Sequence, residues 1–124
     1  MTQPTAAGTS AVPGRDEGHV NEVRIRGRVS AVPEQRELPS GDRIVTARVV
    51  VARPAAAARR QPVDVLDCVG WSARAQRLLL GWQPGALVEV EGAIRRRFRR
   101  QPAGVTSRVE IEVRSARRVR PAAP

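Results

Sequence analysis

The segment VDVLDCVGWSARAQRLLLGW, residues 63–82, changes from one hydrophobic pattern to another and decides the fold. Residues 63–71 are rich in valine and other apolar residues, which is typical of a strand. From residue 72 on, apolar residues recur at helical spacing: Ala75, Leu78, Leu79 and Trp82. Ser72 can cap the start of this helix, and Gly81, followed by QPG, can end it. The segment therefore predicts a strand followed directly by a short helix.

Four further segments have strand patterns. Residues 21–30, 86–97 and 107–119 alternate apolar and polar residues, and residues 43–53 are β-branched and apolar, with Arg48 interrupting. Two of them precede the opening segment and two follow it, so the expected order is strand, strand, strand, helix, strand, strand. This order suits an all-β fold, a five-stranded Greek-key barrel of the OB type with one helix between strands 3 and 4. Gly27 and Gly92 interrupt two of the strand patterns, where a barrel strand can bend sharply.

We expect residues 19–120 to form this single domain. Residues 1–18 are rich in Thr, Ala, Gly, Pro and Ser without hydrophobic periodicity, so they are predicted to be disordered. Residues 121–124 are expected to be a flexible end, and residues 53–62, RPAAAARRQP, a long loop between two strands. No apolar run approaches the roughly 20 residues that cross a bilayer, and the start does not resemble a signal peptide. A cytoplasmic, nucleoid-associated protein is therefore expected.

The chain carries 22 basic residues, all of them arginine, and 12 acidic ones, for a net charge of +10. Because guanidinium groups hold phosphate bidentately and stack on flat rings, this excess favours a polyanionic partner, most simply nucleic acid. One cysteine, Cys68, and one histidine, His19, are too few for a conventional zinc site. The sequence also has no P-loop and no nucleophile motif. Neither a cofactor nor an enzymatic activity is therefore expected.

Three segments resemble, in order and spacing, the bacterial single-stranded DNA-binding protein family: VNEVRIRGRVSAVPEQRELPSGDRI (20–44), LDCVGWSARAQRLL (66–79) and QPGALVEVEGAIRRR (83–97). The resemblance extends from Val20 to Val119 and implies an OB-fold that binds single-stranded DNA without sequence preference, in replication, recombination or repair. In such proteins a basic groove follows the phosphates, and bases stack on aromatic rings. The resemblance also implies homo-oligomers, tetramers or dimers, built partly through the first strand. A full-length paralogue is a further candidate partner.

The chain has three aromatic residues, Trp71, Trp82 and Phe98. Trp71 matches a stacking position of the family, so we predict that it stacks on bases. Trp82 lies on the apolar stripe of the helix and is predicted to pack the helix onto the barrel. Cys68 alternates with Leu66 and is predicted to be buried.

The arginine run EGAIRRRFRRQPAG, residues 91–104, follows directly on a strand pattern. Alternation places Ile94 inward and predicts that the run beyond it projects from the barrel as a basic hairpin. By plain alignment, a stacking tryptophan of the family falls at Arg99, and Phe98 is one place early. Because a slip of one residue turns a side chain to the other face, whether Phe98 or Arg99 faces the bound strand stays open.

The arginines predicted to contact DNA lie on the first two strands, the long loop and the hairpin, and act together with Trp71 and Phe98. They are Arg26, Arg28, Arg48, Arg53, Arg59, Arg60, Arg95, Arg97, Arg99, Arg100 and Arg108. A bound strand would follow this basic surface with its phosphates.

Three features depart from the family pattern. Val65 stands where family members have a stacking tryptophan, and Asp67 places a negative charge on the face expected to meet DNA. The printed chain ends in RPAAP, without the acidic tip that recruits partner proteins in the family, so a shortened paralogue is expected. Two alternatives therefore stay open, an OB-fold RNA-binding module and an oligomerising interaction protein with weakened DNA binding.

Overall fold

The computed structural model describes residues 17–57 and 61–120. Its elements are β1 (Val23–Val29), β2 (Glu34–Glu37), β3 (Arg43–Ala52), the 3-10 helix η2 (Ala55–Ala57), β4 (Val63–Gly70), α1 (Ala73–Leu80), β5 (Leu87–Gln101) and β6 (Gly104–Arg118). The tails predicted at 1–18 and 121–124 lie outside the described residues, except for residues 17 and 18. Arg59 and Arg60 also lie outside them. What we predicted for these residues stays a prediction.

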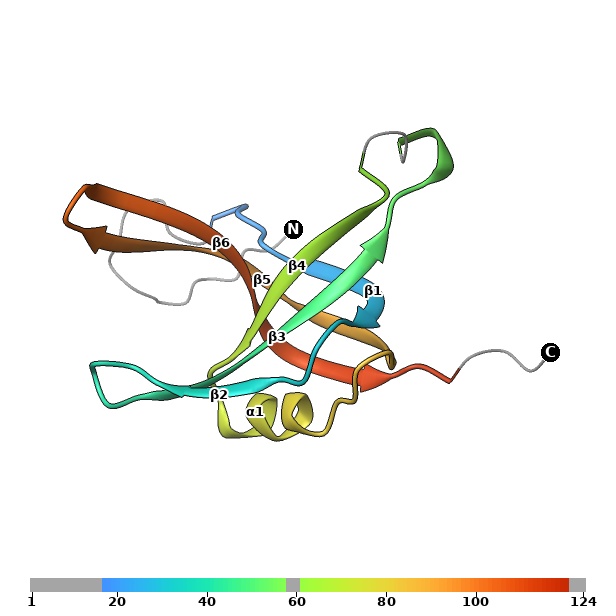
Figure 1. Ribbon diagram of the computed structural model, residues 1–124, viewed down its shortest axis with the longest axis horizontal. Helices are drawn as coiled ribbons and strands as arrows, with labels where there is room; N and C mark the ends of the chain where they lie inside the picture. Colours follow the sequence, from blue (N-terminus) through green and yellow to red (C-terminus); the bar gives the residue numbers. More distant parts are fainter. Residues whose placement is uncertain (1–16, 58–60, 121–124) are drawn as a thin grey trace.

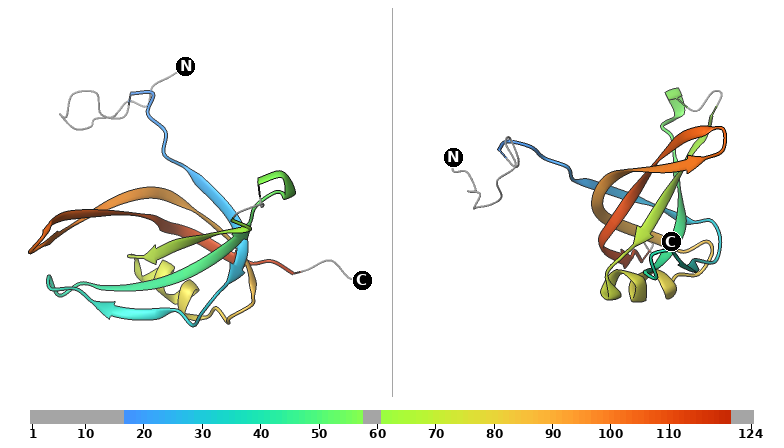
Figure 2. Two further views of the ribbon diagram at one scale, coloured as in Figure 1. Left: turned by 45° about the horizontal axis from the view of Figure 1, so that its top comes forward. Right: turned by 90° about the vertical axis from the view of Figure 1, so that its left-hand side faces the viewer.

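The described residues form one six-stranded sheet that curls around the core (Figures 1 and 2). The strand order is β1-β5-β6-β4-β3-β2, and a short pairing between β1 and β3 closes the sheet into a barrel. Strands β4 and β6 are parallel, and the other paired strands are antiparallel. The predicted all-β barrel of the OB type is confirmed.

Strand β2 is an element that the hydrophobic pattern did not predict. Its residues EQRE are all exposed, and they pair antiparallel with β3. Since none of them is apolar, β2 lacks the alternation that identified the other strands. The structure therefore adds a short edge strand to the five that the sequence predicts. Together with the start of β3 it forms a hairpin that projects from the barrel (Figure 1).

Helix α1 begins and ends where the sequence predicts. The Ser72 side chain accepts a hydrogen bond from the Ala75 backbone N–H at 3.0 Å, and Gly81 follows the last helical residue. Ala75 and Leu79 are buried against the barrel, so α1 packs on it along one stripe. In the described part of the chain, no helix is long and apolar enough to span a membrane.

The core fills the barrel mainly with small and medium apolar side chains, of which valine is the most frequent. Its largest fully buried members are Leu79, Val29, Val45, Val49, Val88, Val90 and Cys68. Trp82 is 5% exposed and belongs to the same cluster, so the predicted packing role of Trp82 is confirmed. The predicted burial of Cys68 is also confirmed, and this burial raises the pKa of its thiol to about 12. Cys68 therefore stays protonated and unreactive at neutral pH.

Gly27 and Gly92 lie where two strands approach too closely for any side chain. A Cβ atom at Gly27 would collide with the Val50 carbonyl oxygen, and one at Gly92 with the Glu112 carbonyl oxygen. These contacts explain why glycine interrupts both strand patterns.

A β-bulge lies opposite Gly92 in the ladder between β5 and β6. Glu91 pairs with Ser115 and Gly92 pairs with Val113, so the extra residue, Arg114, belongs to β6 and the alternation of β5 continues through this point. Ile94 pairs with the buried Ile111 and so lies on the inward face, as predicted. It is nevertheless 47% exposed, because the packed part of the barrel ends there.

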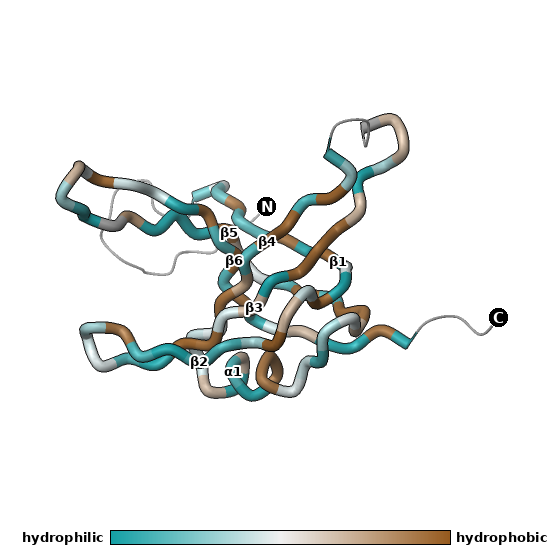
Figure 3. Tube along the Cα trace, viewed as in Figure 1, coloured by the Kyte–Doolittle hydropathy of each residue, from teal (hydrophilic) through white to brown (hydrophobic). Residues whose placement is uncertain are grey.

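Beyond the bulge, β5 and β6 leave the barrel as a hairpin, here called the arm (residues 94–111). Its ladder runs from the pair Ile94–Ile111 to the pair Gln101–Gly104. Figure 1 shows the arm projecting on the same side of the barrel as the β2–β3 hairpin. Figure 3 shows that polar residues are frequent along the arm, whereas β3 and β4 carry long apolar stretches. The predicted projecting hairpin is confirmed.

Candidate nucleic-acid interface

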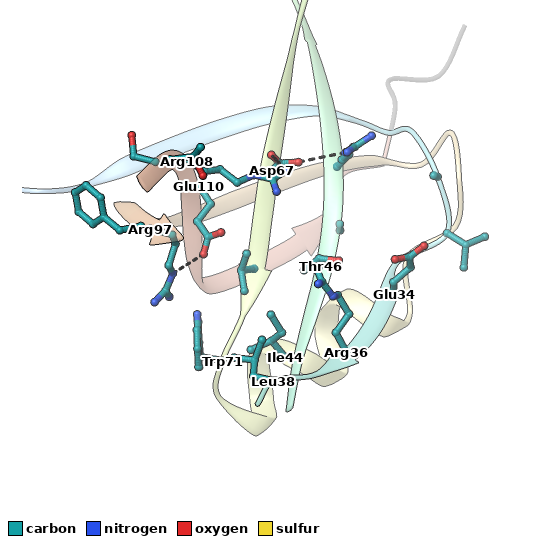
Figure 4. A pocket seen from close by; sticks show the side chains of 18 of the residues that line it. Glu34, Arg36, Leu38, Ile44, Thr46, Asp67, Trp71, Arg97, Arg108 and Glu110 are labelled. Carbon is teal, nitrogen blue, oxygen red and sulfur yellow. Dashed lines mark hydrogen bonds and ion pairs between the residues drawn. The ribbon is translucent and has the colours of Figure 1, made fainter. Parts of the chain in front are cut away.

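A groove of about 710 Å³ opens on the outer face of β3 and β4, between the arm and β2. Its floor includes Thr46, Asp67 and Val69. One wall comes from β2 and its flanking residues, and the other comes from the arm. Figure 4 shows Glu34 and Arg36 on one side, and Arg97, Arg108 and Glu110 on the other. The groove is partly open to solvent, so a ligand can enter it from outside.

Trp71 lies at the arm side of this groove, one residue after the end of β4. The Arg97 guanidinium carbon lies 4.5 Å from the centroid of the Trp71 ring, within the range of a cation–π contact. The Arg97 Nε donates a hydrogen bond to Glu110 Oε2 at 2.8 Å, so Glu110 orients the guanidinium over the ring (Figure 4). The Gln76 side chain donates to the Trp71 carbonyl oxygen at 3.0 Å and anchors the backbone. The ring is therefore held at the groove with one guanidinium already stacked on it.

The indole N–H of Trp71 is buried and has no hydrogen-bond acceptor among the described residues. The orientation of Trp71 therefore comes from packing and from the contact with Arg97, not from a hydrogen bond of the indole.

Asp67 lies in the middle of the groove and is paired with arginines from two strands. Arg48 on β3 donates from Nε to Oδ1 at 3.2 Å, and Arg108 on β6 donates from a terminal nitrogen to Oδ2 at 3.0 Å. The sequence placed the negative charge of Asp67 on the face expected to meet DNA, where it would lower the affinity. In the structure this charge is already neutralised by two of the predicted contact arginines.

The described lining of the groove contains four arginines and three carboxylates, a net charge of +1. The arginines are Arg36, Arg48, Arg97 and Arg108, and the carboxylates are Glu34, Asp67 and Glu110. The groove that the sequence suggested would be strongly basic is thus nearly balanced in charge. The excess positive charge of the chain lies mainly outside it.

Alternation along β5 decides which arm residues share the groove face with Trp71. Arg95 pairs with Glu112 at 2.7 Å and Arg97 pairs with Glu110, so these four residues share one face of the β5–β6 ribbon. Phe98 alternates with Arg97, is 70% exposed and borders the groove. The Arg99 backbone pairs with Thr106, and its side chain lies outside the described set.

The sequence left open whether Phe98 or Arg99 faces a bound strand, and the structure places Arg97 over the Trp71 ring. Sequence reasoning counted Arg97 among the DNA contacts but missed its contact with Trp71. The alternation of β5, which puts Arg97 on the same face as Arg99, was the available signal.

The predicted contact residues fall into two groups. Five of them line the groove: Arg48, Trp71, Arg97, Phe98 and Arg108. The other described ones are placed elsewhere: Arg26, Arg28, Arg53, Arg95 and Arg100. Arg53 pairs with Asp64 at 2.7 Å, and Arg28 donates to the Gly85 carbonyl oxygen at 3.0 Å.

Glu89 on β5 is a buried carboxylate that the sequence did not single out. It is 7% exposed and accepts a hydrogen bond from Arg26 at 2.8 Å, with Arg117 at 3.4 Å. The Arg26 hydrogen bond lowers the pKa of Glu89 below its usual range, although burial acts in the opposite direction. Arg26 therefore has a structural partner on the far side of the sheet from the core.

The closed barrel and its helix after the third long strand define an OB-fold protein. A family model described as the single-strand binding protein family matches residues 20–119. The chain therefore belongs to that family, as its motifs indicated.

One solved structure similar to this chain is that of the Plasmodium falciparum SSB in complex with ssDNA. It shares 18% sequence identity at a TM-score of 0.66, and the match covers 83% of this chain and 96% of that one. At this identity the likeness establishes a shared fold. A search of curated proteins found no match.

Proposed function

We propose that this protein binds single-stranded DNA along the groove, without sequence preference and without catalysis, in replication, recombination or repair. Membership of the single-strand binding family supports the proposal. The observation that carries it is the stack of Arg97 on Trp71 at the edge of an open groove. A flat ring beside a guanidinium offers a nucleobase a surface on which to stack, whatever the base.

In this proposal the strand crosses the outer face of β3 and β4 between the β2 wall and the arm. Bases stack on Trp71 and Phe98, and the phosphates meet Arg48, Arg97 and Arg108. The arginines outside the groove extend this path: Arg26, Arg28, Arg53, Arg59, Arg60, Arg95, Arg99 and Arg100. The two projecting hairpins flank the groove, which would let them enclose a flexible strand.

A titration of intrinsic tryptophan fluorescence with oligo-dT tests the proposal. We expect quenching on binding, and an affinity that falls as the salt concentration rises, because each neutralised phosphate releases counterions. Trp71→Ala should weaken binding about tenfold, since one base stack contributes roughly 1–3 kcal/mol. Trp82→Phe is the matched control: Trp82 is 5% exposed in the core, so this variant should keep its affinity.

The proposal fails if the protein does not bind oligo-dT even at low salt. Competition between matched dT and rU oligomers separates DNA binding from the RNA-binding alternative. Tighter binding of rU would favour RNA.

A second candidate function is an oligomerising interaction protein with weakened DNA binding. The nearly balanced charge of the groove favours it. In the described part of the chain, β1 pairs with β3 only at Arg28 and Val29, so the rest of this edge can accept another strand. A second copy of the chain, in a dimer or tetramer, or a full-length paralogue are the proposed partners. Native mass spectrometry of the protein alone and after co-expression measures both.

A further inference from the structure

Asp67 connects the two sides of the groove through its carboxylate. It lies on β4, between Arg48 on β3 and Arg108 on β6, and each of its oxygens accepts from one of them. The three side chains are partly exposed, at 29% for Asp67, 61% for Arg48 and 55% for Arg108. The cluster is therefore open to a ligand that enters the groove. Both arginines are candidates for phosphate contacts, and both already have an anionic partner.

We propose that Asp67 is a specificity-determining residue that lowers the affinity of the groove for phosphate, so that a bound strand is held mainly through its bases. This inference rests on the proposed function. Asp67 competes with the DNA backbone for the same two guanidinium groups. The groove then selects ligands that offer bases to Trp71 and Phe98 in addition to phosphates.

The exchange of partners explains the low affinity for phosphate. A phosphate that takes Arg108 from Asp67 replaces one charge-assisted hydrogen bond by another of similar strength. It also leaves the carboxylate close to the negative charge of the phosphate, which is repulsive. A single phosphate contact therefore adds little binding free energy. Base stacking does not require an arginine to leave Asp67, so stacking contributes its full binding free energy.

The salt dependence of binding should show the same exchange. When an arginine without an anionic partner neutralises a phosphate, the cation condensed on that phosphate is released. When the arginine first has to leave Asp67, the freed carboxylate attracts a cation from solution. The two effects offset each other, so binding by the natural protein should depend on salt less than a net charge of +10 suggests.

Glu110 repeats this arrangement at the arm. It accepts a hydrogen bond from Arg97 at 2.8 Å, and its side chain is 12% exposed. Three of the four groove arginines are thus paired with a carboxylate that also lines the groove.

The experiment compares Asp67→Asn with the natural protein by titration with oligo-dT over a range of salt concentrations. Asn keeps the shape of the side chain but frees Arg48 and Arg108 from an anionic partner. We expect affinity at low salt to rise about tenfold. The slope of log K against log salt should become steeper by about 0.7–1.4, which corresponds to one or two additional phosphates.

The matched control is Glu37→Gln, which changes the net charge by the same amount. Glu37 is an exposed residue of β2 between Arg36 and Leu38, and in the described structure it does not line the groove. Its replacement should alter affinity less than twofold. A rise equal to that of Asp67→Asn would mean that overall charge accounts for the effect, and it would overturn the inference.

A double-mutant cycle with Arg108→Gln gives a second readout. In the natural protein this substitution should weaken binding by less than it does in the Asp67→Asn background, because a phosphate reaches Arg108 only by taking it from Asp67. In the Asp67→Asn background it should cost about tenfold, because Arg108 is then free for phosphate. Equal losses in both backgrounds would overturn the inference, as would unchanged affinity and salt slope in Asp67→Asn alone.

The outcomes separate this inference from the proposed function. If the natural protein binds oligo-dT and Asp67→Asn binds no more tightly, this inference fails and the proposed function stands. If neither binds at any salt concentration, both fail. Inorganic phosphate as a competitor supplies an independent check: it should displace oligo-dT from Asp67→Asn at lower concentration than from the natural protein.

Discussion

The two parts of strand β5 obey the same alternation and yet have opposite roles. Before the bulge, Val88 and Val90 are fully buried, and the intervening Glu89 is covered by arginines of the neighbouring strands. After it, Ala93 is the last buried side chain, and the arm carries exposed apolar residues such as Phe98 and Val105. The first part belongs to a closed barrel with a packed interior. The second is a two-stranded ribbon that presents both faces to solvent.

This difference shows that the surroundings of a strand, and not its own pattern, determine which face packs in the core and which face is free to bind a ligand. In the barrel the inward face is filled by side chains from the opposite strands, and apolar burial contributes stability there. On the arm no second layer covers the equivalent face in the described structure, so its side chains are available to a ligand. The bulge marks the point at which β5 passes from the packed barrel to the exposed arm.

The largest expected effect is at the bulge itself. Gly92→Val should lower the free energy of unfolding by about 3 kcal/mol, because its Cβ would collide with the Glu112 carbonyl oxygen. Chemical denaturation measures this change. Gly81→Ala is the control: its Cβ would lie 3.7 Å from the nearest atom, so a change within about 0.5 kcal/mol is expected. Equal effects would show that the close approach at Gly92 does not constrain the barrel.

A smaller effect is expected from truncating valines on either side of the bulge. Val90→Ala should destabilise the protein by about 2 kcal/mol, since Val90 is fully buried and the lost methyl groups leave a cavity. Val105→Ala on the arm should cost less than about 0.5 kcal/mol, because Val105 is 63% exposed. Thermal unfolding of both variants compares them directly. A large loss for Val105→Ala would mean that the arm is packed against something in solution.

The smallest effect concerns carboxylates on the two parts of the sheet. The lowered pKa of Glu89 means that its ionised form stabilises the folded state above the usual carboxyl pKa, and this contribution is lost as the pH falls through the lowered value. Glu89→Gln should therefore remove part of the stability loss of the natural protein on acidification. Glu112→Gln, which breaks the more exposed pair with Arg95 at the base of the arm, should leave the acid profile nearly unchanged. The free energy of unfolding measured from pH 7 to pH 3 distinguishes the two variants. Identical pH profiles would contradict the stabilising role of ionised Glu89.

Much of the fold could be predicted from local patterns. Period-two alternation and runs of β-branched apolar residues located the five long strands, and the switch to helical spacing after Trp71 located α1 with its Ser72 cap. The buried roles of Cys68 and Trp82 followed from their place in these patterns. Strand β2 was not predicted, because its exposed polar residues are held by pairing with β3. This tertiary interaction produces no apolar pattern in the sequence.

The candidate site could be predicted only in part. The arginine-rich hairpin and Trp71 stand out in the sequence as residue types that bind nucleic acid. Whether an arginine is free for phosphate depends on which carboxylate lies next to it in space, and Asp67 is 41 residues away from Arg108 along the chain. Such pairs cannot be read from spacing, because the β4–β6 neighbourhood that creates them arises only when the barrel closes.

The sequence by itself determined the order of strands and helix, the composition of the core and the family to which the chain belongs. Each of these depends on periodicity and on residue type, which local physics converts directly into structure. The tertiary structure alone decided that Arg97 stacks on Trp71, and that Arg48 and Arg108 share Asp67. Barrel closure is the physical reason, because it brings residues that are distant along the chain within hydrogen-bonding distance.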